Sequence, residues 1–394
     1  MISVPKVVKG ALLIAGTTIG GGMLAMPVLT SSGGFIPSVF LFVACWLFMA
    51  ATGLLFLEIC LWMEGDTNII SMAKATLGLP GQIFSWILYL FMFFTLTLAY
   101  TVICGKLTGE FFQALFPTWS GSIVFLLLFG PLIWAGAWLV GRVNVFMMAG
   151  LILSYLGFVY VGAPYVRFEN LMEGNWLLSL KALPVAFAAF GFQGTVPTLT
   201  RYLDRDVKKT RAAILWGSGA ALLTYIVWHW LILGIIPKEG LLASLETGDT
   251  AVMPLKDSIQ NQAVFVISEF FSFFALVTSF LGVTLGLRDF LADGLNVEKT
   301  RLGRLFLCLL IFVPVLIVGA LYPGIFIEAL QLAGGFGTAL LLGLLPICMT
   351  WAGRYHLGFE DHSLVRGGKP VLVLMALFVL IEVSFEVLHL LHMY

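Results

Sequence analysis

Long apolar runs recur along the whole chain and limit what it can fold into. Eleven of them fall at approximately 7–30, 36–63, 81–112, 121–140, 143–165, 179–201, 211–236, 259–288, 303–322, 324–350 and 370–392. A helix needs about 20 apolar residues to cross the hydrocarbon core of a bilayer, and these runs lack the alternation of β-barrel strands. The sequence therefore predicts an all-α integral membrane protein.

Composition supports this prediction and excludes several other classes. Only 11% of the 394 residues are charged, whereas a soluble domain has about a quarter. Lys plus Arg equals Asp plus Glu at 21 each, which argues against a nucleic-acid partner. The five cysteines lie in apolar runs without a CxxC pair and are interpreted as small hydrophobic residues. We expect the lipid bilayer to be the main partner, in the inner membrane of a bacterium.

The basic residues orient the spans. Sixteen Lys and Arg residues lie on the side that holds the amino terminus, against five on the other: Lys106, Arg167, Lys181, Lys238 and Lys256. Basic residues near span ends stay cytoplasmic. We therefore expect a cytoplasmic amino terminus and a periplasmic carboxyl terminus. The longest outer loop, roughly 237–262, is expected to act as a lid.

The first run contains AGTTIGGGMLAMP, from Ala15 to Pro27. Four glycines weaken a helix, and non-helical backbone survives at membrane depth only where it is buried in protein or lines a cavity. One interpretation is an unwound segment. The other is that Gly16 and Gly20 form a small-residue face on which a second helix packs.

The sixth run favours the first interpretation, because it is interrupted too. AFAAFGFQGTVP places Gly191 and Gly194 before Pro197. Paired broken segments in two halves of a chain are typical of a secondary transporter with a site at the bilayer midplane. Freed amides attract an anionic group and freed carbonyls attract an ammonium group. A zwitterion such as an amino acid fits both.

At this point a family resemblance is visible. AGTTIGGGMLAMP, ATGLLFLE in the second run, Tyr100 in the third, FGFQGTVP in the sixth and TSFLGVTLGLRDFLADGL (Thr278 to Leu295) resemble the hydroxy and aromatic amino acid permeases, in their tyrosine permease branch. NIISMAKATLG and GQIFSWILYLF are most similar to chlamydial members. The family belongs to the amino acid, polyamine and organocation superfamily.

The resemblance implies the leucine-transporter (LeuT) fold, with a 5+5 inverted repeat and an added eleventh transmembrane helix. The implied parts are residues 1–165 (helices 1–5), 166–350 (helices 6–10) and 351–394 (a loop and helix 11). A bundle of helices 1, 2, 6 and 7 would rock against a scaffold of helices 3, 4, 8 and 9. The implied substrate-binding residues are Thr17, Gly20, Gly21, Gly22, Tyr100, Phe190, Gly191, Phe192 and Gln193.

Within that set the resemblance gives each group a task. The substrate carboxylate meets the amides of Gly20 to Gly22 with Tyr100 closing over it, and the ammonium meets carbonyls near Phe190 and Gly191. The residues alone leave alternatives: Tyr100 as an interface tyrosine, and Phe190 and Phe192 as lipid-facing bulk. Gln193 either donates to a substrate hydroxyl or satisfies the unwound backbone.

The coupling ion is interpreted from two patterns. Many proton-coupled relatives carry Lys and His at the positions of Leu151 and Gln193, which cannot titrate here. FFALVTSF instead provides Ala275, Thr278 and Ser279, which resembles the pattern of sodium-coupled members. The implied sodium ligands are Gly16, Ile19, Ala275, Thr278 and Ser279, and oxygen ligands suit a hard cation. We favour sodium over a proton and expect no organic cofactor.

Other ionisable residues lie inside the runs. Glu58 is expected to be structural. Glu269 and His229 lie deeper within their runs than Glu58 does. They are the candidate proton carriers if transport is not coupled to sodium. Glu382, Glu386 and His389 share one face of the last helix, and no function is assigned to them.

Two other functional classes, a membrane-embedded enzyme and a channel, agree less well with the sequence. A membrane-embedded enzyme needs a catalytic pair at matched depth, yet the Asp residues are confined to loops. A channel repeats a pore element around an axis, whereas this chain is expected to repeat once with inversion. We therefore expect a transporter and not an enzyme.

Overall fold

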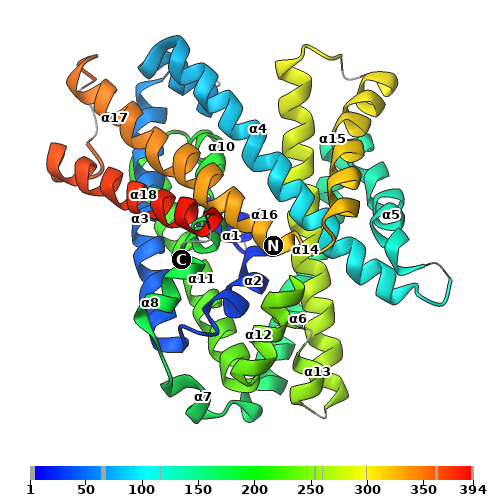
Figure 1. Cartoon of the computed structure of the whole chain (residues 1–394). Coiled ribbons are helices and arrows are strands. Elements are labelled where there is room, and N and C mark those ends of the chain that lie inside the picture. The colour runs from blue at the N-terminus through cyan, green and yellow to red at the C-terminus, as the bar shows by residue number, and fades with distance from the viewer. Residues whose placement is uncertain are drawn as a thin grey trace.

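The structure is a computed structural model that describes residues 5–63, 68–115, 117–252, 254–259, 261–298, 300–359 and 363–391. These residues are almost entirely helical (Figure 1). Ten helices are long and apolar enough to cross a membrane, and the bent pair at the amino terminus makes eleven when counted as one span. The all-α membrane prediction is confirmed.

Most spans are single long helices. They are α3 (Phe35–Trp62), α4 (Ile69–Phe111), α5 (Gly121–Ala135), α6 (Ala137–Gly162), α11 (Val207–Ile235), α14 (Gln262–Gly294), α15 (Arg301–Leu321) and α18 (Gly368–Leu390). The tenth span is composite: α16 (Phe326–Leu332), a π-helical segment η5 (Ala333–Leu344) and α17 (Leu345–Tyr355). Short helices join the spans: η1 (Thr118–Ser120), η2 (Ala163–Tyr165), α7 (Phe168–Met172), α12 (Lys238–Thr247) and α13 (Leu255–Ser258).

Spans one and six are broken where the sequence predicts it. The first consists of α1 (Lys6–Thr18) and α2 (Gly22–Thr30), whose axes are bent by 55°. The sixth consists of α8 (Trp176–Ser179), η3 (Leu180–Ala182), α9 (Leu183–Ala189), η4 (Gln193–Thr195) and α10 (Val196–Tyr202). Its main chain leaves the helical path between Phe190 and Phe192. The unwound interpretation is therefore confirmed in both spans.

Two predicted helix boundaries are wrong. The junction between spans four and five lies at Gly136 and not near residue 142, so Arg142 is inside α6. Gly136 has φ +106°, a backbone conformation that favours glycine. Arg288 and Arg304 donate to the carbonyls of Ile133 and Ala135, which satisfies this early helix end. The third span begins at Ile69, ahead of a kink at Gly78.

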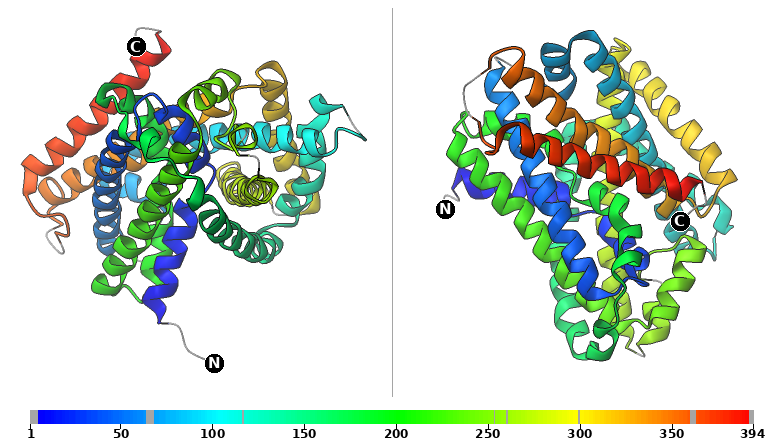
Figure 2. Two further views of the ribbon diagram at one scale, coloured as in Figure 1. Left: turned by 90° about the horizontal axis from the view of Figure 1, so that it is seen from below. Right: turned by 60° about the vertical axis from the view of Figure 1, so that its left-hand side comes forward.

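The helices pack as two groups. α1 lies along α11, and α3 packs on α11 and α10. In the second group α4, α5, α14 and α15 pack on one another, and α6 lies along α14. The left view of Figure 2 shows α1 and α11 side by side, away from α5 and α15. These groups correspond to the expected bundle and scaffold.

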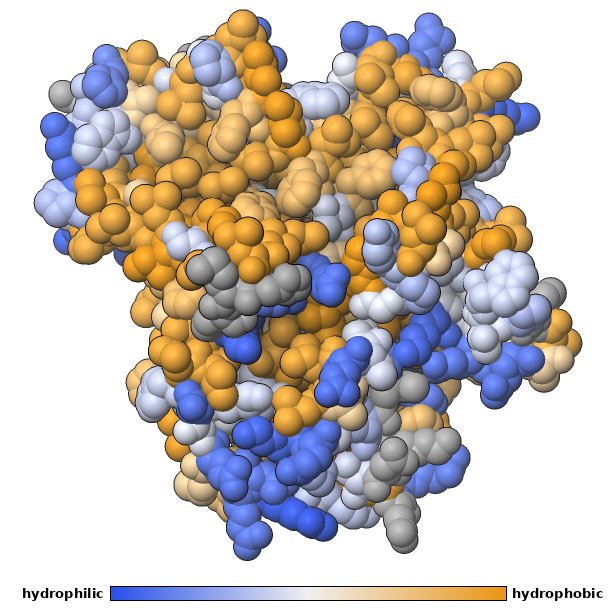
Figure 3. Space-filling view, viewed as in Figure 1, coloured by the Kyte–Doolittle hydropathy of each residue, from blue (hydrophilic) through white to orange (hydrophobic). Residues whose placement is uncertain are grey.

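The molecular surface fits a bilayer. Figure 3 shows apolar side chains over much of one face, and polar ones gathered at the end that carries α7 and α12. Exposed apolar residues are frequent on α5, α6 and α15, among them Leu127, Phe146 and Leu302. These helices present their apolar sides outward, as lipid-facing helices do.

Glu58 on α3 is buried in an ion pair with Arg354 on α17. Arg354 Nε and Nη2 donate to the two carboxylate oxygens at 2.6 and 2.7 Å, and the Leu364 amide donates to Oε2 at 2.9 Å. The side chains are 1% and 9% exposed. Both carboxylate oxygens are therefore used to join α3, α17 and the loop before α18, which gives Glu58 the structural role expected for it.

We predict that Arg354→Met lowers the free energy of unfolding by about 3–5 kcal/mol, because it leaves a buried carboxylate without its cation. The double variant Glu58→Gln, Arg354→Met should recover most of this loss. Thermal unfolding in detergent, with the exposed Lys369→Met as control, measures both. A single variant as stable as the parent, or a double variant no better than the single, contradicts the prediction.

Candidate functional site

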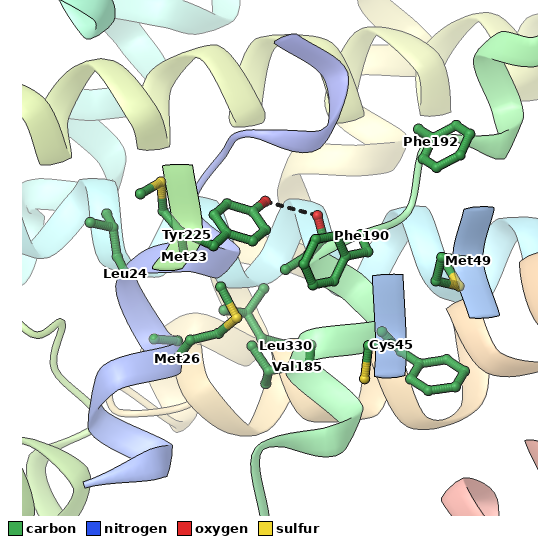
Figure 4. Packing of buried hydrophobic residues seen from close by; sticks show 14 of the residues in the cluster. Met23, Leu24, Met26, Cys45, Met49, Val185, Phe190, Phe192, Tyr225 and Leu330 are labelled. Carbon is green, nitrogen blue, oxygen red and sulfur yellow. Dashed lines mark hydrogen bonds between the residues drawn. The ribbon is translucent and has the colours of Figure 1, made fainter. Parts of the chain in front are cut away.

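The two chain breaks face each other in the centre of the molecule. A Cβ atom at Gly22 would lie 3.2 Å from the Cβ of Ala189, so the start of α2 touches the end of α9. The Tyr225 hydroxyl on α11 lies 2.6 Å from the Thr18 carbonyl oxygen and 2.9 Å from that of Ala189. Figure 4 shows the Tyr225 side chain pointing to the end of α9.

These two carbonyls are those of the last residues of α1 and α9. The carboxyl end of a helix carries partial negative charge and unpaired carbonyls. A hydroxyl has a single proton and donates to one acceptor at a time. These two carbonyls thus offer more acceptor capacity than the Tyr225 hydroxyl satisfies.

The amino end of α2 lies on the other side of the break. The Gly21 amide donates to Ser279 Oγ on α14 at 3.0 Å. A Cβ atom at Gly21 would lie 2.5 Å from Tyr100 Cε1 and 2.9 Å from Leu276 Cδ2, so the ring of Tyr100 rests on bare main chain. Tyr100 is buried, which excludes its alternative role as an interface tyrosine.

Phe190 and Phe192 point in different directions. The ring of Phe190 meets Tyr225 edge-on, with centroids 5.0 Å apart. Phe192 instead packs against α3, where a Cβ atom at Gly53 would lie 2.7 Å from its ring. Figure 4 shows Phe192 on the far side of Phe190 from Tyr225. Both rings are buried and do not face lipid. Only Phe190 contacts Tyr225, the residue that lies between the two breaks.

Gln193 satisfies the unwound backbone. Its Oε1 accepts from the Phe192 amide at 2.9 Å, and its Nε2 donates to Thr52 Oγ1 at 2.8 Å and to the Met49 carbonyl at 3.1 Å. The side chain is fully buried. Of the two roles considered for it, the contacts favour the structural one, in which Gln193 ties the break in span six to α3.

The predicted cation ligands are partly assembled. Ser279 Oγ donates to the Ala275 carbonyl at 2.8 Å, and Thr278 Oγ1 lies within 3.1 Å of the same oxygen. A Cβ atom at Gly20 would overlap Ser279 Oγ, which places span one directly on α14. Gly16 lies farther along α1, against Met148 of α6, and Ile19 is half-buried beside the break. Thr17 is exposed, and its hydroxyl donates to the Leu13 carbonyl.

The half of span one that α2 forms is enclosed by protein. All nine residues of α2 are buried. Trp228 Nε1 donates to the Met23 carbonyl at 3.0 Å, and the Ala251 amide of the 237–262 loop donates to the Leu24 carbonyl at 3.2 Å. The loop is fixed to α4 by an ion pair between Lys106 and Asp249. It covers α2, as expected of a lid.

The opposite side of the breaks is accessible. Gly194 and Thr198 on span six are exposed, as is Gly282 on α14, and Gly20 and Ser279 are half-buried. A Cβ atom at Gly282 or at Gly194 would meet nothing within 4 Å. Figure 3 shows the surface notched at the end opposite the lid. The breaks are thus covered on the lid side, and exposed residues lie only on the opposite side among those named here.

Sequence reasoning missed Tyr225. A hydroxyl in the middle of the apolar seventh run was the available signal for Tyr225. Glu269 is exposed on α14. His229 is buried. Its Nε2 lies 2.9 Å from Thr30 Oγ1, which itself donates to the Met26 carbonyl, so the network assigns the ring proton to Nε2.

We predict that Gly21→Ala reduces substrate transport at least tenfold, because the added methyl group would meet the Tyr100 ring 1 Å closer than ordinary contact, about 3.5 Å, allows. Gly141→Ala on α6, where nothing lies within 4 Å, is the matched control. Uptake of labelled substrate into proteoliposomes measures both. Equal uptake by the two variants contradicts the role given to Gly21.

Known proteins resemble this chain over nearly its whole length. The model of the tryptophan/tyrosine permease family matches residues 3–385. A tyrosine-specific transport system of Haemophilus influenzae is 32% identical, with 95% of each chain covered. A tryptophan-specific transport protein of the same organism is 29% identical, covering 97% of this chain and 96% of its own.

Solved structures share the fold. MhsT in complex with L-phenylalanine superposes with a TM-score of 0.59 at 13% identity, covering 95% of this chain and 98% of its own. A manganese transporter of Eremococcus coleocola gives 0.60 at 14% identity, covering 96% and 85%. At such identities the likeness is one of fold, and the fold is that of the LeuT-type transporters.

Proposed function

The chain belongs to the tryptophan/tyrosine permease family, and from this premise we propose that it imports tyrosine by symport with sodium. The family and the fold make it an aromatic amino acid transporter and not an enzyme. Tyrosine is the proposed substrate because the chain resembles the tyrosine permease branch. The tyrosine-specific relative, at 32% identity, supports this choice.

The convergence of the Thr18 and Ala189 carbonyls on one point carries the proposal. In it the substrate ammonium lies between these two oxygens and Tyr225, where three donors replace one. The carboxylate meets amides of Gly20, Gly21 and Gly22 at the positive end of α2. The two charged ends of one amino acid are thereby matched by opposite helix ends across the breaks.

The aromatic ring of the substrate is proposed to lie against Phe190, with Gly191 allowing close approach. Offset or edge contacts between rings contribute about 1 kcal/mol each. Phe192 and Gln193 then act one layer farther out, by holding the break against α3 through Gly53, Met49 and Thr52. Tyr100 closes over the carboxylate side from α4.

Sodium is proposed to bind between span one and α14, with oxygen ligands from Gly16, Ile19, Ala275, Thr278 and Ser279. The hydroxyls of Thr278 and Ser279 donate backward along α14. Their remaining lone pairs are therefore available to a cation. Oxygen ligands without a thiolate or imidazole suit a hard ion. Because Gly20 touches Ser279, a cation there would hold span one against the scaffold.

Alternating access is proposed to follow from rocking of the two helix groups, built from the repeats 1–165 and 166–350, with 351–394 added outside them. With the amino terminus in the cytoplasm and the carboxyl terminus in the periplasm of a bacterial inner membrane, the lid faces outward. The structure then represents an inward-facing state. Opening outward requires separation of Lys106 from Asp249 and release of α2 from the lid.

Proton coupling is the second candidate, and His229 is the observation that favours it. Its Nδ1 has no hydrogen-bond partner among the described residues, and its ring lies between Phe35 and Phe42. A proton added at Nδ1 would be a buried, unpaired charge next to α2. Protonation of His229 would therefore change how its ring packs on Phe35, Phe42 and α2. A proton carrier beside α2 needs such a coupling between its charge and its contacts.

We predict that replacing sodium by choline at fixed pH abolishes concentrative uptake of labelled tyrosine. Thr278→Ala should lose the sodium dependence while the protein remains folded, because one cation ligand is removed. Thr224→Ala is the matched control, since this half-buried threonine donates backward in the same way on α11. Sodium-driven uptake that persists in Thr278→Ala would count against the cation site, and uptake that follows only the proton gradient would favour His229.

A further inference from the structure

Two carboxylates are buried on one face of the last helix. Glu382 is 0% and Glu386 1% exposed, and a spacing of four residues places them one above the other. Neither carboxyl oxygen of Glu382 has a hydrogen-bond partner among the described residues, and the same holds for Glu386 Oε2. The neighbouring Ile381 and Val387 are exposed. The polar side of α18 is thus turned into the protein.

The pair of glutamates packs against η5 and faces three other titratable side chains. The stem of Glu386 lies on Gly335 of η5, where a Cβ atom would be 2.6 Å from its Cγ. One turn toward the amino end, Val379 packs on Gly343. The titratable groups that face the pair are the Cys45 thiol of α3 toward Glu382, and Lys181 of η3 and His389 of α18 around Glu386.

A carboxylate in such a place holds a proton. An ionised carboxyl group without a partner is strongly disfavoured in an apolar interior, and it is neutralised instead. A metal ion would need about six oxygen ligands, whereas the described residues contain no group of three or more His, Cys, Asp or Glu suited to a metal. A proton needs one oxygen atom.

The pair has a route to one face of the molecule. A cavity of about 10 Å³ is bounded by Lys181, Pro184, Gln331, Glu386 and His389, which is about the size that one water molecule occupies. Lys181, Gln331 and His389 also line a cavity of about 510 Å³, whose other walls include residues 245–248 of the lid. A proton can therefore reach Glu386 from the lid face and pass to Glu382 one turn away.

We propose that Glu382 and Glu386 form a proton-binding site, filled from the lid face and separate from the substrate and sodium sites. In the protonated state each carboxyl group holds a proton, so that both are neutral and α18 can lie on η5 as it does here. Loss of the proton places negative charge in an apolar contact and drives the carboxylates toward the cavity and water.

The site is joined to the broken sixth span by two adjacent glycines. Gly335 contacts Glu386, and the preceding Gly334 lies so close to the Pro184 carbonyl of α9 that a Cβ atom would overlap it. η5 is a long π-helical segment, a form that is rare and often found at functional sites. A shift of η5 on deprotonation therefore moves α9, whose last residue, Ala189, forms the ammonium site.

The first test is spectroscopic and needs no transport. Infrared difference spectra of the full chain in lipid, taken between neutral and alkaline pH, should show the carbonyl stretch of a protonated carboxyl group that disappears on deprotonation. The double variant Glu382→Gln, Glu386→Gln should lack this band. Glu328→Gln, on the exposed face of α16, should retain it. Absence of the band from the parent protein, or its persistence in the double variant, would overturn the site.

The second test reads the consequence for transport. With the sodium gradient held fixed, tyrosine uptake by the parent should fall at least threefold as the pH rises and the site loses its proton. The double variant Glu382→Gln, Glu386→Gln resembles the protonated form, so its uptake should be insensitive to pH. If the two glutamates only fill space, the variant will show the same pH dependence of uptake as the parent. That result would reject the proposal. Failure of tyrosine exchange in the parent as well as in the variants would refute the proposed substrate instead. The infrared band would still report the protonated carboxyl groups.

Discussion

The Tyr225 hydroxyl holds together the two features on which the rest of the structure depends. It lies between the carbonyls that end α1 and α9, and it keeps these two helix ends close without satisfying both. A buried carbonyl left without a donor costs about 1–3 kcal/mol. The breaks are therefore maintained at a cost that a ligand with several donors can offset. The proposed ammonium group of an amino acid substrate would be such a ligand.

The surrounding helices are joined within each group by charged side chains. Within one group, Arg205 donates to three carbonyls at the end of α3, and Lys6 pairs with Asp204. Within the other, Arg288 and Arg304 close the end of α5. Between the groups, Gly21 meets Tyr100 and Ser279, the lid pairs with Lys106, and the ring of Trp228 packs on those of Phe158 and Phe271. The proposed rocking motion would have to break these contacts.

Much of this organisation could be predicted from local sequence, and the remainder could not for identifiable reasons. Glycine clusters and apolar runs act locally, so both breaks and the class of fold were predictable. The two carbonyls that meet at Tyr225 come from spans one and six, while Tyr225 lies in span seven, and no local sequence pattern predicts that meeting. Phe190 and Phe192 have the same sequence context, yet the turn at Gly191 sends their rings to different sides. Glu269 is exposed because it lies on the outward side of α14. A run that is apolar all round does not indicate which side of the helix faces outward.

The central claim is that main-chain groups at the two breaks bind both charged ends of one amino acid. Displacement of labelled tyrosine by two analogues tests it directly: tyramine, which lacks the carboxylate, and hydroxyphenylpropionate, which lacks the ammonium. Each loses a charged group and leaves buried partners unpaired, so the account predicts that each binds at least roughly 100-fold more weakly than tyrosine. Displacement by either analogue at tyrosine-like concentrations would contradict it.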